Sequence, residues 1–533
     1  MSENWYQNAI FYELNVRAFR DSNGDGKGDL PGVIEKLDYL KDLGVDCLWL
    51  LPIYPSPLKD DGYDIADFMH IHPDFGTVED FKRLMDEAHK RDMHVIADLV
   101  LNHCSDQHEW FQSALKDPSS KYKDYFVWSK TGKEYADTRI IFLDTEPSNW
   151  TYSPEVGEYY WHRFYASQPD LNYRNPALQE EMINTMRYWA SLGLDGFRAD
   201  AVPYLFEQEG TNCENLPETH EFLKKIRAIL DKEYPGRILL AEANQWPNDV
   251  REYFGNGDEF SMAFHFPLMP RIYMSMKKGD PAPIRWALEN TPAIPDGCQW
   301  CTFLRNHDEL TLEMVTEEER QWMWQQYAPD PKMKLNLGIR RRFAPLLDND
   351  MEKMKQANAI LFSLPGTPII YYGDEIGMGD NIDLFDRNGV RTPMQWSASA
   401  KNAGFSEGSN LYAPVIDSPD YSPAKVNVED QQKDPESMLH FMKHIVKLRR
   451  ERPFLAGSNI QFVQNTSAAT LCVMREGDSR RMLAMHNLGE NSAYVTLPDA
   501  LNFKPKMELL TGTPVPPGLK TYKLAPHQSA WLE

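Results

Sequence analysis

Three carboxylates, Asp200, Glu242 and Asp308, each follow a short apolar run in the sequence. The runs are residues 194–197, 238–241 and 301–304. If these runs are strands of a parallel α/β barrel, their C-terminal ends face one common pocket. Cleavage of a glycosidic bond needs one carboxylate as nucleophile and one carboxylic acid as proton donor. The three acids therefore predict an enzyme that cleaves or transfers a glycosyl group.

The neighbours of each acid indicate different tasks. Arg198 lies two residues before Asp200, so on a strand both side chains point to one face, where a guanidinium lowers the carboxyl pKa. Glu242 follows an apolar run, and desolvation raises the pKa of such a group toward that of a working acid. Asp308, next to His307, is placed to bind sugar hydroxyls. Each acid alone also fits a structural ion pair or a solvated turn, but all three at strand ends favour catalysis.

The chain up to about residue 450 alternates short β-rich runs with amphipathic helices, which favours a parallel sheet with helices outside. A helix is expected from Leu30-Pro31 to Gly44, and another from a capping-box-like start at Thr77 to about Lys90. Strands are expected at 9–16, 47–51, 94–100, a run ending at 200, 238–242, 262–266, 301–305 and 368–372. Eight strand–helix units predict an α/β fold, a closed (β/α)8 TIM barrel.

Two segments interrupt this alternation and a third follows it. Residues 103–172 contain no clear strand–helix unit, and a stretch of this length predicts an inserted lobe after strand three. Residues 310–350 are expected to form a helical excursion over the pocket. From 453 to 533 short alternating strands predict a C-terminal antiparallel β-sandwich domain. The catalytic barrel would then consist of residues 1–102 and 173–452.

One loop has the spacing of a cation site. Its oxygen-bearing residues stand at alternate positions with glycines between them, as in the first half of an EF-hand loop. These residues are Asp21, Asn23, Asp25, Lys27 and Asp29. No Glu stands at the twelfth position, which is Gly32, so this is not a complete EF-hand, and a simple polar turn remains an alternative.

Composition and charge argue against some classes of partner and indicate a cellular compartment. The 533 residues carry a formal net charge of −23, so a nucleic acid would be repelled. No apolar stretch approaches the roughly 20 residues of a membrane span, and the N-terminus lacks the basic and apolar regions of a secretion signal. Six widely scattered cysteines indicate reduced thiols. Together these features predict a cytoplasmic protein without membrane or nucleic acid partners.

The sequence resembles the α-amylase family, glycoside hydrolase family 13. The likeness covers nearly the whole chain and lies in the strand-five Glu242 and three motifs: 98–103 (Asp-Leu-Val-Leu-Asn-His), 196–200 (Gly-Phe-Arg-Ala-Asp) and 306–308 (Asn-His-Asp). It implies that Asp200 is the nucleophile, Glu242 the general acid/base and Asp308 the stabiliser of the transition state. It also implies that the first sugar subsite is lined by Asp64, Tyr63, His103, Arg198 and His307, with Tyr63 as its stacking wall.

Four further segments, 200–207, 210–220, 264–270 and 389–396, are similar to family members that interconvert maltose and trehalose. That likeness implies a disaccharide isomerase acting through a covalent glucosyl-enzyme, with minor hydrolysis to glucose. A closed pocket would exclude water, and Arg391, the lobe and the excursion are candidates for that closure. The alternatives are a hydrolase of the oligo-1,6-glucosidase type, which shares the three acids, and a non-catalytic relative, which would tolerate their loss.

The family likeness also implies ligands and assembly. It supports structural calcium or magnesium in the 21–29 loop, no organic cofactor and, by analogy alone, a homodimer through the C-terminal domain. A second structural calcium would tie the inserted lobe to strand four. Its ligands would be Asn102, Asp170, Glu207 and the backbone carbonyls of Tyr204 and Leu205.

Overall fold

A computed structural model of the chain describes residues 4–533. Within them, eight parallel strands close into a barrel in the order β1-β14-β10-β9-β8-β7-β3-β2, which confirms the predicted fold. The strands are β1 (Phe11–Leu14), β2 (Cys47–Leu50), β3 (His94–Val100), β7 (Gly196–Asp200), β8 (Ile238–Ala241), β9 (Met262–Phe264), β10 (Gln299–Phe303) and β14 (Thr367–Tyr371). Neighbouring strands lie in parallel register all the way round, so their C-terminal ends form one rim.

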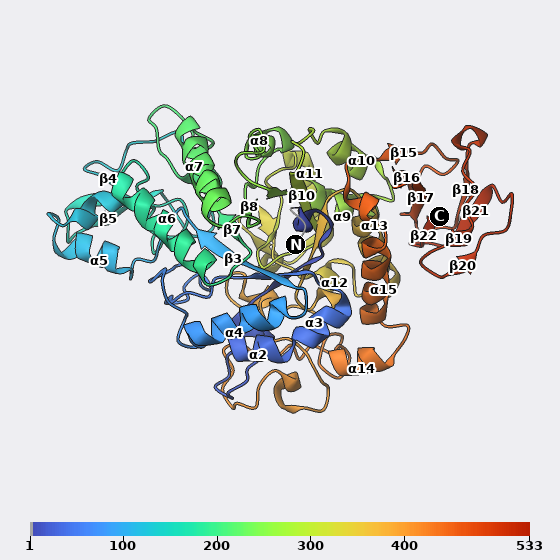
Figure 1. Cartoon of the computed structure of the whole chain (residues 1–533), viewed down its shortest axis with the longest axis horizontal. Helices are drawn as coiled ribbons and strands as arrows, with labels where there is room; N and C mark the ends of the chain where they lie inside the picture. The colour runs from blue at the N-terminus through green and yellow to red at the C-terminus, as the bar shows by residue number, and fades with distance from the viewer. Residues whose placement is uncertain (1–3) are drawn as a thin grey trace.

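Helices surround the barrel, as Figure 1 shows. They are α2 (Leu30–Glu35), α3 (Leu37–Leu43), α4 (Val78–His89), α6 (Pro176–Ser191), α7 (Pro217–Glu233), α8 (Pro247–Glu252), α9 (Leu268–Lys278), α10 (Ala282–Glu289), α13 (Met351–Ser363), α14 (Val428–Lys433) and α15 (Met438–Arg450). The predicted capping box at Thr77 is present, with Asp80 as its partner. The helix expected over 30–44 is instead two helices that meet at Lys36, and Gly44 ends the second with φ 95°.

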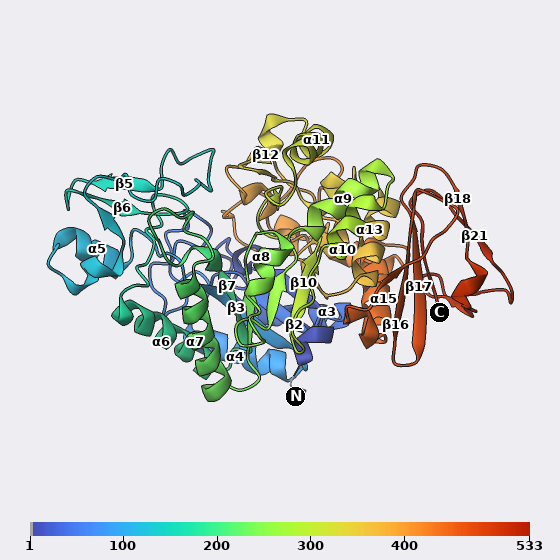
Figure 2. The same cartoon turned by 90° about the horizontal axis from the view of Figure 1, so that it is seen from above.

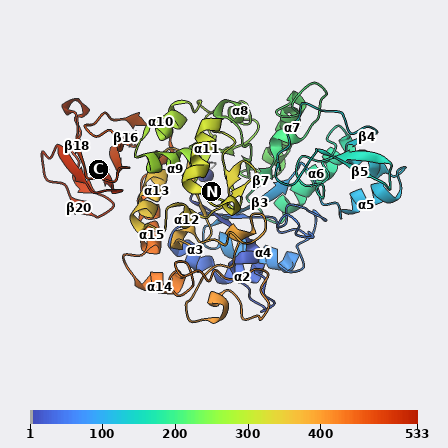
Figure 3. The same ribbon diagram turned by 180° about the vertical axis from the view of Figure 1, so that it is seen from behind.

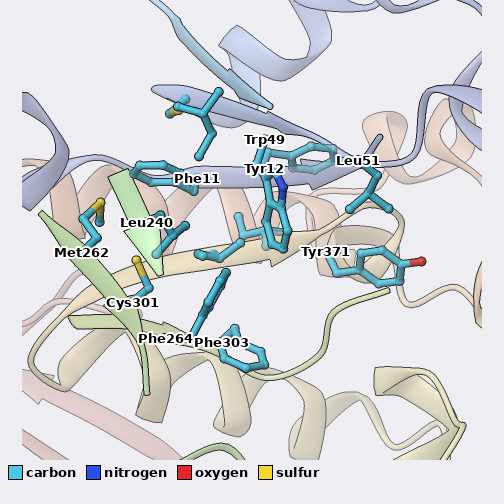
Figure 4. Packing of buried hydrophobic residues seen from close by; sticks show 14 of the residues in the cluster. Phe11, Tyr12, Trp49, Leu51, Leu240, Met262, Phe264, Cys301, Phe303 and Tyr371 are labelled. Carbon is cyan, nitrogen blue, oxygen red and sulfur yellow. The ribbon is translucent and has the colours of Figure 1, made fainter. Parts of the chain in front are cut away.

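Large side chains fill the barrel interior. Figure 4 shows Trp49 facing Phe264, Phe303 and Leu240 across the barrel, all of them buried. Aromatic residues here pack edge to face; the Phe264 and Phe303 ring centroids, for example, are 5.6 Å apart at 83°. The interior is therefore a packed core, and a ligand can bind only at the rim.

The lobe after β3 begins with α5 (Glu109–Lys116) and contains a small antiparallel sheet, β4 (Trp128–Ser129), β6 (Glu158–Trp161) and β5 (Trp150–Ser153). A bridge between His103 and Asp170 joins its two ends. The excursion after β10 is only partly helical, contrary to the sequence prediction. Besides α11 (Glu317–Tyr327) and α12 (Phe343–Leu346), it forms a three-stranded sheet of β11 (Leu310–Thr311), β13 (Gly338–Ile339) and β12 (Lys334–Leu335).

The C-terminal domain is antiparallel, as predicted. Its larger sheet has the order β15 (Gln461–Phe462), β16 (Thr470–Gly477), β17 (Arg480–Asn487), β22 (Ser529–Leu532), β19 (Met507–Glu508) and β20 (Thr513–Pro514). A second sheet of β18 (Ala493–Thr496) and β21 (Thr521–Leu524) covers a separate apolar cluster around Leu483 and Val495. Figures 1 and 2 show this domain and the lobe at opposite ends of the barrel.

Candidate active site

The three predicted acids meet at one cavity on the C-terminal rim of the barrel. Ala199 of β7 pairs with Ala241 of β8, so the residues that follow them, Asp200 and Glu242, lie at the same height. Asp308, which follows β10, lines the same cavity. The cavity has a volume of about 100 Å³, small beside the roughly 300–1,000 Å³ of typical ligand pockets. The catalytic acids therefore line a small cavity at the rim.

Arg198 lies beneath two of these acids. Its Nη1 donates to Asp200 Oδ1 at 2.5 Å, and its Nη2 is 3.1 Å from Glu242 Oε1. Burial raises the pKa of Asp200 to about 6 and that of Glu242 to about 7, and Arg198 opposes both shifts. The lowering of the Asp200 pKa expected from Arg198 is therefore present, but burial outweighs it. Between these two values Asp200 is mainly ionised and Glu242 mainly protonated, as a nucleophile and a proton donor must be.

Asp308 is held by three positive groups. Arg387 Nη1 and Arg391 Nη2 donate to its Oδ1 at 2.8 and 3.0 Å, and His307 Nε2 is 3.2 Å from its Oδ2. Burial would raise the pKa of Asp308, but these charges outweigh it and hold that pKa well below its usual range. Asp308 is therefore a fixed anion. His307 in turn is paired through Nδ1 with buried Glu13 at 2.5 Å.

Three residues predicted for the first sugar subsite do line the cavity: Tyr63, His103 and His307. The Tyr63 and His307 rings stack at 5.2 Å and 11°, which gives the subsite a flat wall. Burial lowers the pKa of His103 to about 3, so its imidazole is neutral. Arg198 touches the acids but does not itself line the cavity.

The structure contradicts the placement of Asp64 and Arg391 against the sugar. Asp64 is completely buried, and its carboxylate accepts hydrogen bonds from Ser56 Oγ and from the N–H groups of Lys59 and Asp60. It therefore fixes a turn. Arg391 is 3% exposed, does not line the cavity, and donates to the His307 carbonyl and to Asp308. It positions the stabilising acid and is no lid.

An acid–arginine pair that was not predicted from the sequence lines the cavity in place of Asp64 and Arg391. Asp60 and Arg387 both line the cavity, and Arg387 Nη2 donates to Asp60 Oδ1 at 2.7 Å. Arg387 also bridges to Asp308, so it links one wall of the cavity to the catalytic centre. A buried arginine beside several acids is typical of such a site. However, 327 positions separate Arg387 from Asp60, so no local sequence pattern pairs them.

The lobe and the excursion meet above the cavity. Phe142 and Phe164 of the lobe and Glu313 of the excursion line it. Arg139 of the lobe joins the excursion through Nη1, 2.6 Å from Glu313 Oε2, and the loop after β7 through Nε, 2.8 Å from Glu214 Oε1. Both segments thus form a roof over the cavity, and Arg139 is the cation that connects the lobe to the excursion.

The residues predicted to bind a second cation satisfy a simple test of fit. Asn102 Oδ1, Asp170 Oδ2 and Glu207 Oε1 are buried and have no hydrogen-bond partner among residues 4–533. Burial raises the pKa of Asp170 to about 8, and burial and the nearby Asp170 raise that of Glu207. Two carboxylates and an amide oxygen left unpaired together are the donor set that Ca²⁺ prefers. Tyr204 and Leu205 lie just before Glu207 in the chain.

The 21–29 loop gives a different result. Asp21 accepts hydrogen bonds from the N–H groups of Asn23, Gly24 and Gly26, and Asp29 caps α2 by accepting from Gly32 N. Within residues 4–533, no buried side-chain oxygen of this loop lacks a partner. Lys27 forms an ion pair with Asp74 at 2.8 Å. The loop is thus satisfied as a tight turn, and the structure adds no argument for a cation to that of the spacing.

A closed parallel barrel with three acids at its C-terminal rim defines a glycoside-cleaving enzyme. In agreement, residues 14–457 match the alpha-amylase catalytic domain, and the chain belongs to the alpha-amylase family. Its relatives include the trehalose synthase/amylase of Mycobacterium tuberculosis, 55% identical over 91% of this chain and 82% of the relative. The trehalose synthase of Pimelobacter sp. is 52% identical over 96% of this chain and 92% of the relative.

Other relatives are more distant. The alpha-glucosidase of Culex pipiens is 33% identical over 96% of this chain and 87% of its own length. Among solved structures, the trehalulose synthase MutB of Pseudomonas mesoacidophila superposes with a TM-score of 0.81 at 28% identity, covering 99% of both chains. Within residues 4–533, no helix is both long and apolar enough to cross a membrane.

Proposed function

We propose that this enzyme interconverts maltose and trehalose by moving one glucosyl unit within a closed site, with minor hydrolysis to glucose. The observation that carries the proposal is the position of Asp200 and Glu242 at one small cavity that the lobe and the excursion cover. Support comes from the trehalose synthases that are 49–57% identical to this chain. The alternative, a hydrolase of the alpha-glucosidase type, has more distant support at 30–33% identity.

In the first half of the reaction, Asp200 attacks the anomeric carbon of the non-reducing glucose. Glu242 donates its proton to the glycosidic oxygen, and the bond to the second glucose breaks. Asp308 stays ionised beside the cationic transition state because its three positive neighbours hold it so. The products are a covalent glucosyl-enzyme and one free glucose inside the cavity.

In the second half, the free glucose turns and presents its anomeric hydroxyl. Glu242, now a carboxylate, takes the proton of that hydroxyl while the oxygen attacks the glucosyl-enzyme and Asp200 leaves. The two displacements retain the configuration of the transferred glucose and yield trehalose. Water must stay out during the turn, and enclosure under the Arg139 roof provides that exclusion.

The proposal is tested by proton NMR of the purified enzyme with maltose alone, following the anomeric signals over time. Trehalose should rise well ahead of free glucose. Release of glucose without trehalose would instead establish the hydrolase, with the same barrel and acids.

Arg139→Ala is expected to shift the product ratio from trehalose toward glucose. Removal of its guanidinium leaves Glu313 and Glu214 without a shared partner, so the roof opens more often and admits water to the glucosyl-enzyme. The glucose-to-trehalose ratio in the NMR assay should rise severalfold while maltose consumption persists. Lys133→Ala, an exposed charge change in the same lobe, is the control. An unchanged ratio in Arg139→Ala would refute the assigned role.

We further propose that Asn102, Asp170 and Glu207, with the carbonyls of Tyr204 and Leu205, hold a structural Ca²⁺. The ion would neutralise two buried carboxylates where the lobe rejoins the barrel, and it takes no part in the displacements. The 21–29 loop is a secondary candidate for Ca²⁺ or Mg²⁺, supported by spacing alone.

Calcium should therefore stabilise the protein by about 2.7 kcal/mol when its concentration is 100 times its Kd. Thermal unfolding followed with CaCl2 and with a chelator measures the effect as a rise in Tm. Asp170→Asn should remove the contribution of this site to the response, and Asp25→Asn measures separately whether the 21–29 loop contributes. Equal Tm values for the parent protein with calcium and with chelator would contradict the site.

Compartment and assembly complete the proposal. All six cysteines are buried and unpaired, which fits a reducing compartment, and we propose a cytoplasmic enzyme acting on small sugars. A homodimer through the C-terminal domain is part of the same proposal and rests on family analogy.

A further inference from the structure

A second cavity, of about 560 Å³, lies between the barrel helices and the C-terminal domain. Its walls come from α13, α15 and three turns, residues 435–437, 510–512 and 527–529. Figures 1 and 3 show α13 and α15 standing between the barrel and the C-terminal strands. The volume falls within the range of small-molecule sites. The catalytic cavity shares none of its lining residues, so the two cavities are distinct. We call this second cavity the interdomain cleft.

Buried polar groups without partners line the interdomain cleft. Gln356 is 1% exposed; its Nε2 donates to the Asn487 carbonyl at 2.6 Å, and its Oε1 has no partner among residues 4–533. His527 is 6% exposed, and its Nδ1 is likewise unpartnered, while its Nε2 is 3.2 Å from the exposed Glu490 carboxylate. An unpaired buried donor or acceptor costs free energy that a polar ligand can recover.

The remaining wall offers both hydrogen bonds and an apolar face. His440 uses its Nδ1 toward Ser437 Oγ at 3.1 Å, and His444 uses its Nε2 toward the Leu509 carbonyl at 3.0 Å. In both imidazoles the second ring nitrogen can therefore serve a ligand. Phe441, half-buried between these histidines on α15, adds an aromatic surface. Hydroxyl-rich molecules with apolar C–H faces match such a wall.

Charge and geometry argue against anions and metal ions as ligands of the cleft. Lys355 is the single lysine or arginine of the lining, and its Nζ is 3.8 Å from Glu352 Oε1, with Glu436 also at the rim. Two carboxylates against one ammonium do not attract phosphate or another anion. Three histidines, cysteines or acids do not converge into a metal site anywhere in residues 4–533. The lining therefore fits a neutral, polyhydroxylated ligand better than an anion or a metal ion.

We propose that the interdomain cleft is a second, non-catalytic binding site for a neutral mono- or disaccharide. The sugar hydroxyls would pair with Gln356 Oε1, His527 Nδ1, the free imidazole nitrogens and, at the edge of the cleft, Lys355 Nζ, and Phe441 would cover one sugar face. Because the cleft joins α13 and α15 to the C-terminal turns, a bound sugar would hold the two domains together. This site goes beyond the proposed isomerase activity and does not depend on it.

The test counts maltose sites by calorimetry on full-length Asp200→Asn, which binds sugar without turning it over. Two sites per chain are expected. In this background, Lys355→Ala and Phe441→Ala should each weaken the second site about tenfold or more, which corresponds to the loss of one good contact. Met351→Ala on α13 and Lys447→Ala on α15, both exposed and outside the lining, should leave both sites intact. Glucose and trehalose then define which sugar the cleft prefers.

Hydrogen exchange locates the second site independently. Maltose should protect amides in 435–444 and 510–512 in Asp200→Asn, and at the same maltose concentration this protection should decrease in Asp200→Asn/Lys355→Ala. A single site per chain overturns the proposal, and so do two sites that both cleft variants leave unchanged. If Phe441→Ala lowers Tm, Lys355→Ala decides, because that side chain is partly exposed and lies at the edge of the cleft. If Asp200→Asn binds two maltose molecules but the parent enzyme does not isomerise maltose, the proposed isomerase activity is wrong and the second site stands.

Discussion

Asp200→Ala should lose about 10⁴-fold or more of its kcat for both trehalose formation and glucose release. Both products derive from one glucosyl-enzyme, so removal of the nucleophile must abolish them together. The loss should appear without unfolding, because Arg198 keeps its partners Asp98 and Glu242 when Asp200 is gone. Initial rates by NMR and Tm by calorimetry measure the two quantities.

A chemical rescue experiment separates a lost nucleophile from a disturbed site. Azide entering the space vacated in Asp200→Ala attacks the anomeric carbon of an activated α-glucoside once, so the glucosyl azide should have the inverted, β configuration. In Glu242→Ala the nucleophile remains, two displacements occur, and the azide product should be α. An α product from Asp200→Ala would show that another group acts as nucleophile.

Glu242→Gln is expected to lower kcat on maltose by about 10²–10⁴-fold, the usual contribution of a general acid. Its amide keeps the contact to Ala201 N–H but has no proton to donate. Activated substrates, whose leaving groups need no proton, should lose much less in the formation of the glucosyl-enzyme. Equal losses on maltose and on an activated glucoside would rule out the acid role.

The same residue should set the alkaline side of the pH profile. In the parent enzyme kcat/KM should rise as Asp200 ionises near pH 6 and fall as Glu242 loses its proton near pH 7. Because the acid form of Glu242 is the active one, activity is lost as pH rises through its raised pKa. In Glu242→Gln the alkaline fall should disappear and the acid-side rise should remain. Persistence of that fall would assign it to another group.

The barrel and its three acids could be predicted because local patterns determine them. An apolar run followed by an acid encodes both a buried strand and the residue at its C-terminal end, as at Asp200 and Glu242. The contacts of Arg198 with Asp200 and of His307 with Asp308 followed from their nearness in sequence. The direction of the Glu242 pKa shift followed from the apolar run before it.

The wrong predictions concern residues whose partners are distant in sequence or whose side-chain direction is set by a turn. Asp60, Asp61 and Asp64 are equally plausible acids in sequence. Asp61 and Gly62 have φ values of 47° and 110°, and this turn leaves Asp60 lining the cavity and Asp64 in the interior. The choice between Arg387 and Arg391 depends on packing against a loop more than 300 residues away. Burial also raises the pKa of Asp200 more than Arg198 lowers it, and the extent of burial cannot be read from a sequence.

The roof that Arg139 connects links the rate of maltose turnover to the fraction of glucosyl-enzyme that escapes hydrolysis. The lobe and the excursion cover a cavity of about 100 Å³, and we expect the roof to open further when a disaccharide enters, an opening that also admits water. A roof that opened more readily would turn over maltose faster but would lose more glucosyl-enzyme to water. A tighter roof would preserve the isomer and slow each cycle. Selection can therefore set only the balance between the two, through the strength of contacts such as those of Arg139 with Glu214 and Glu313.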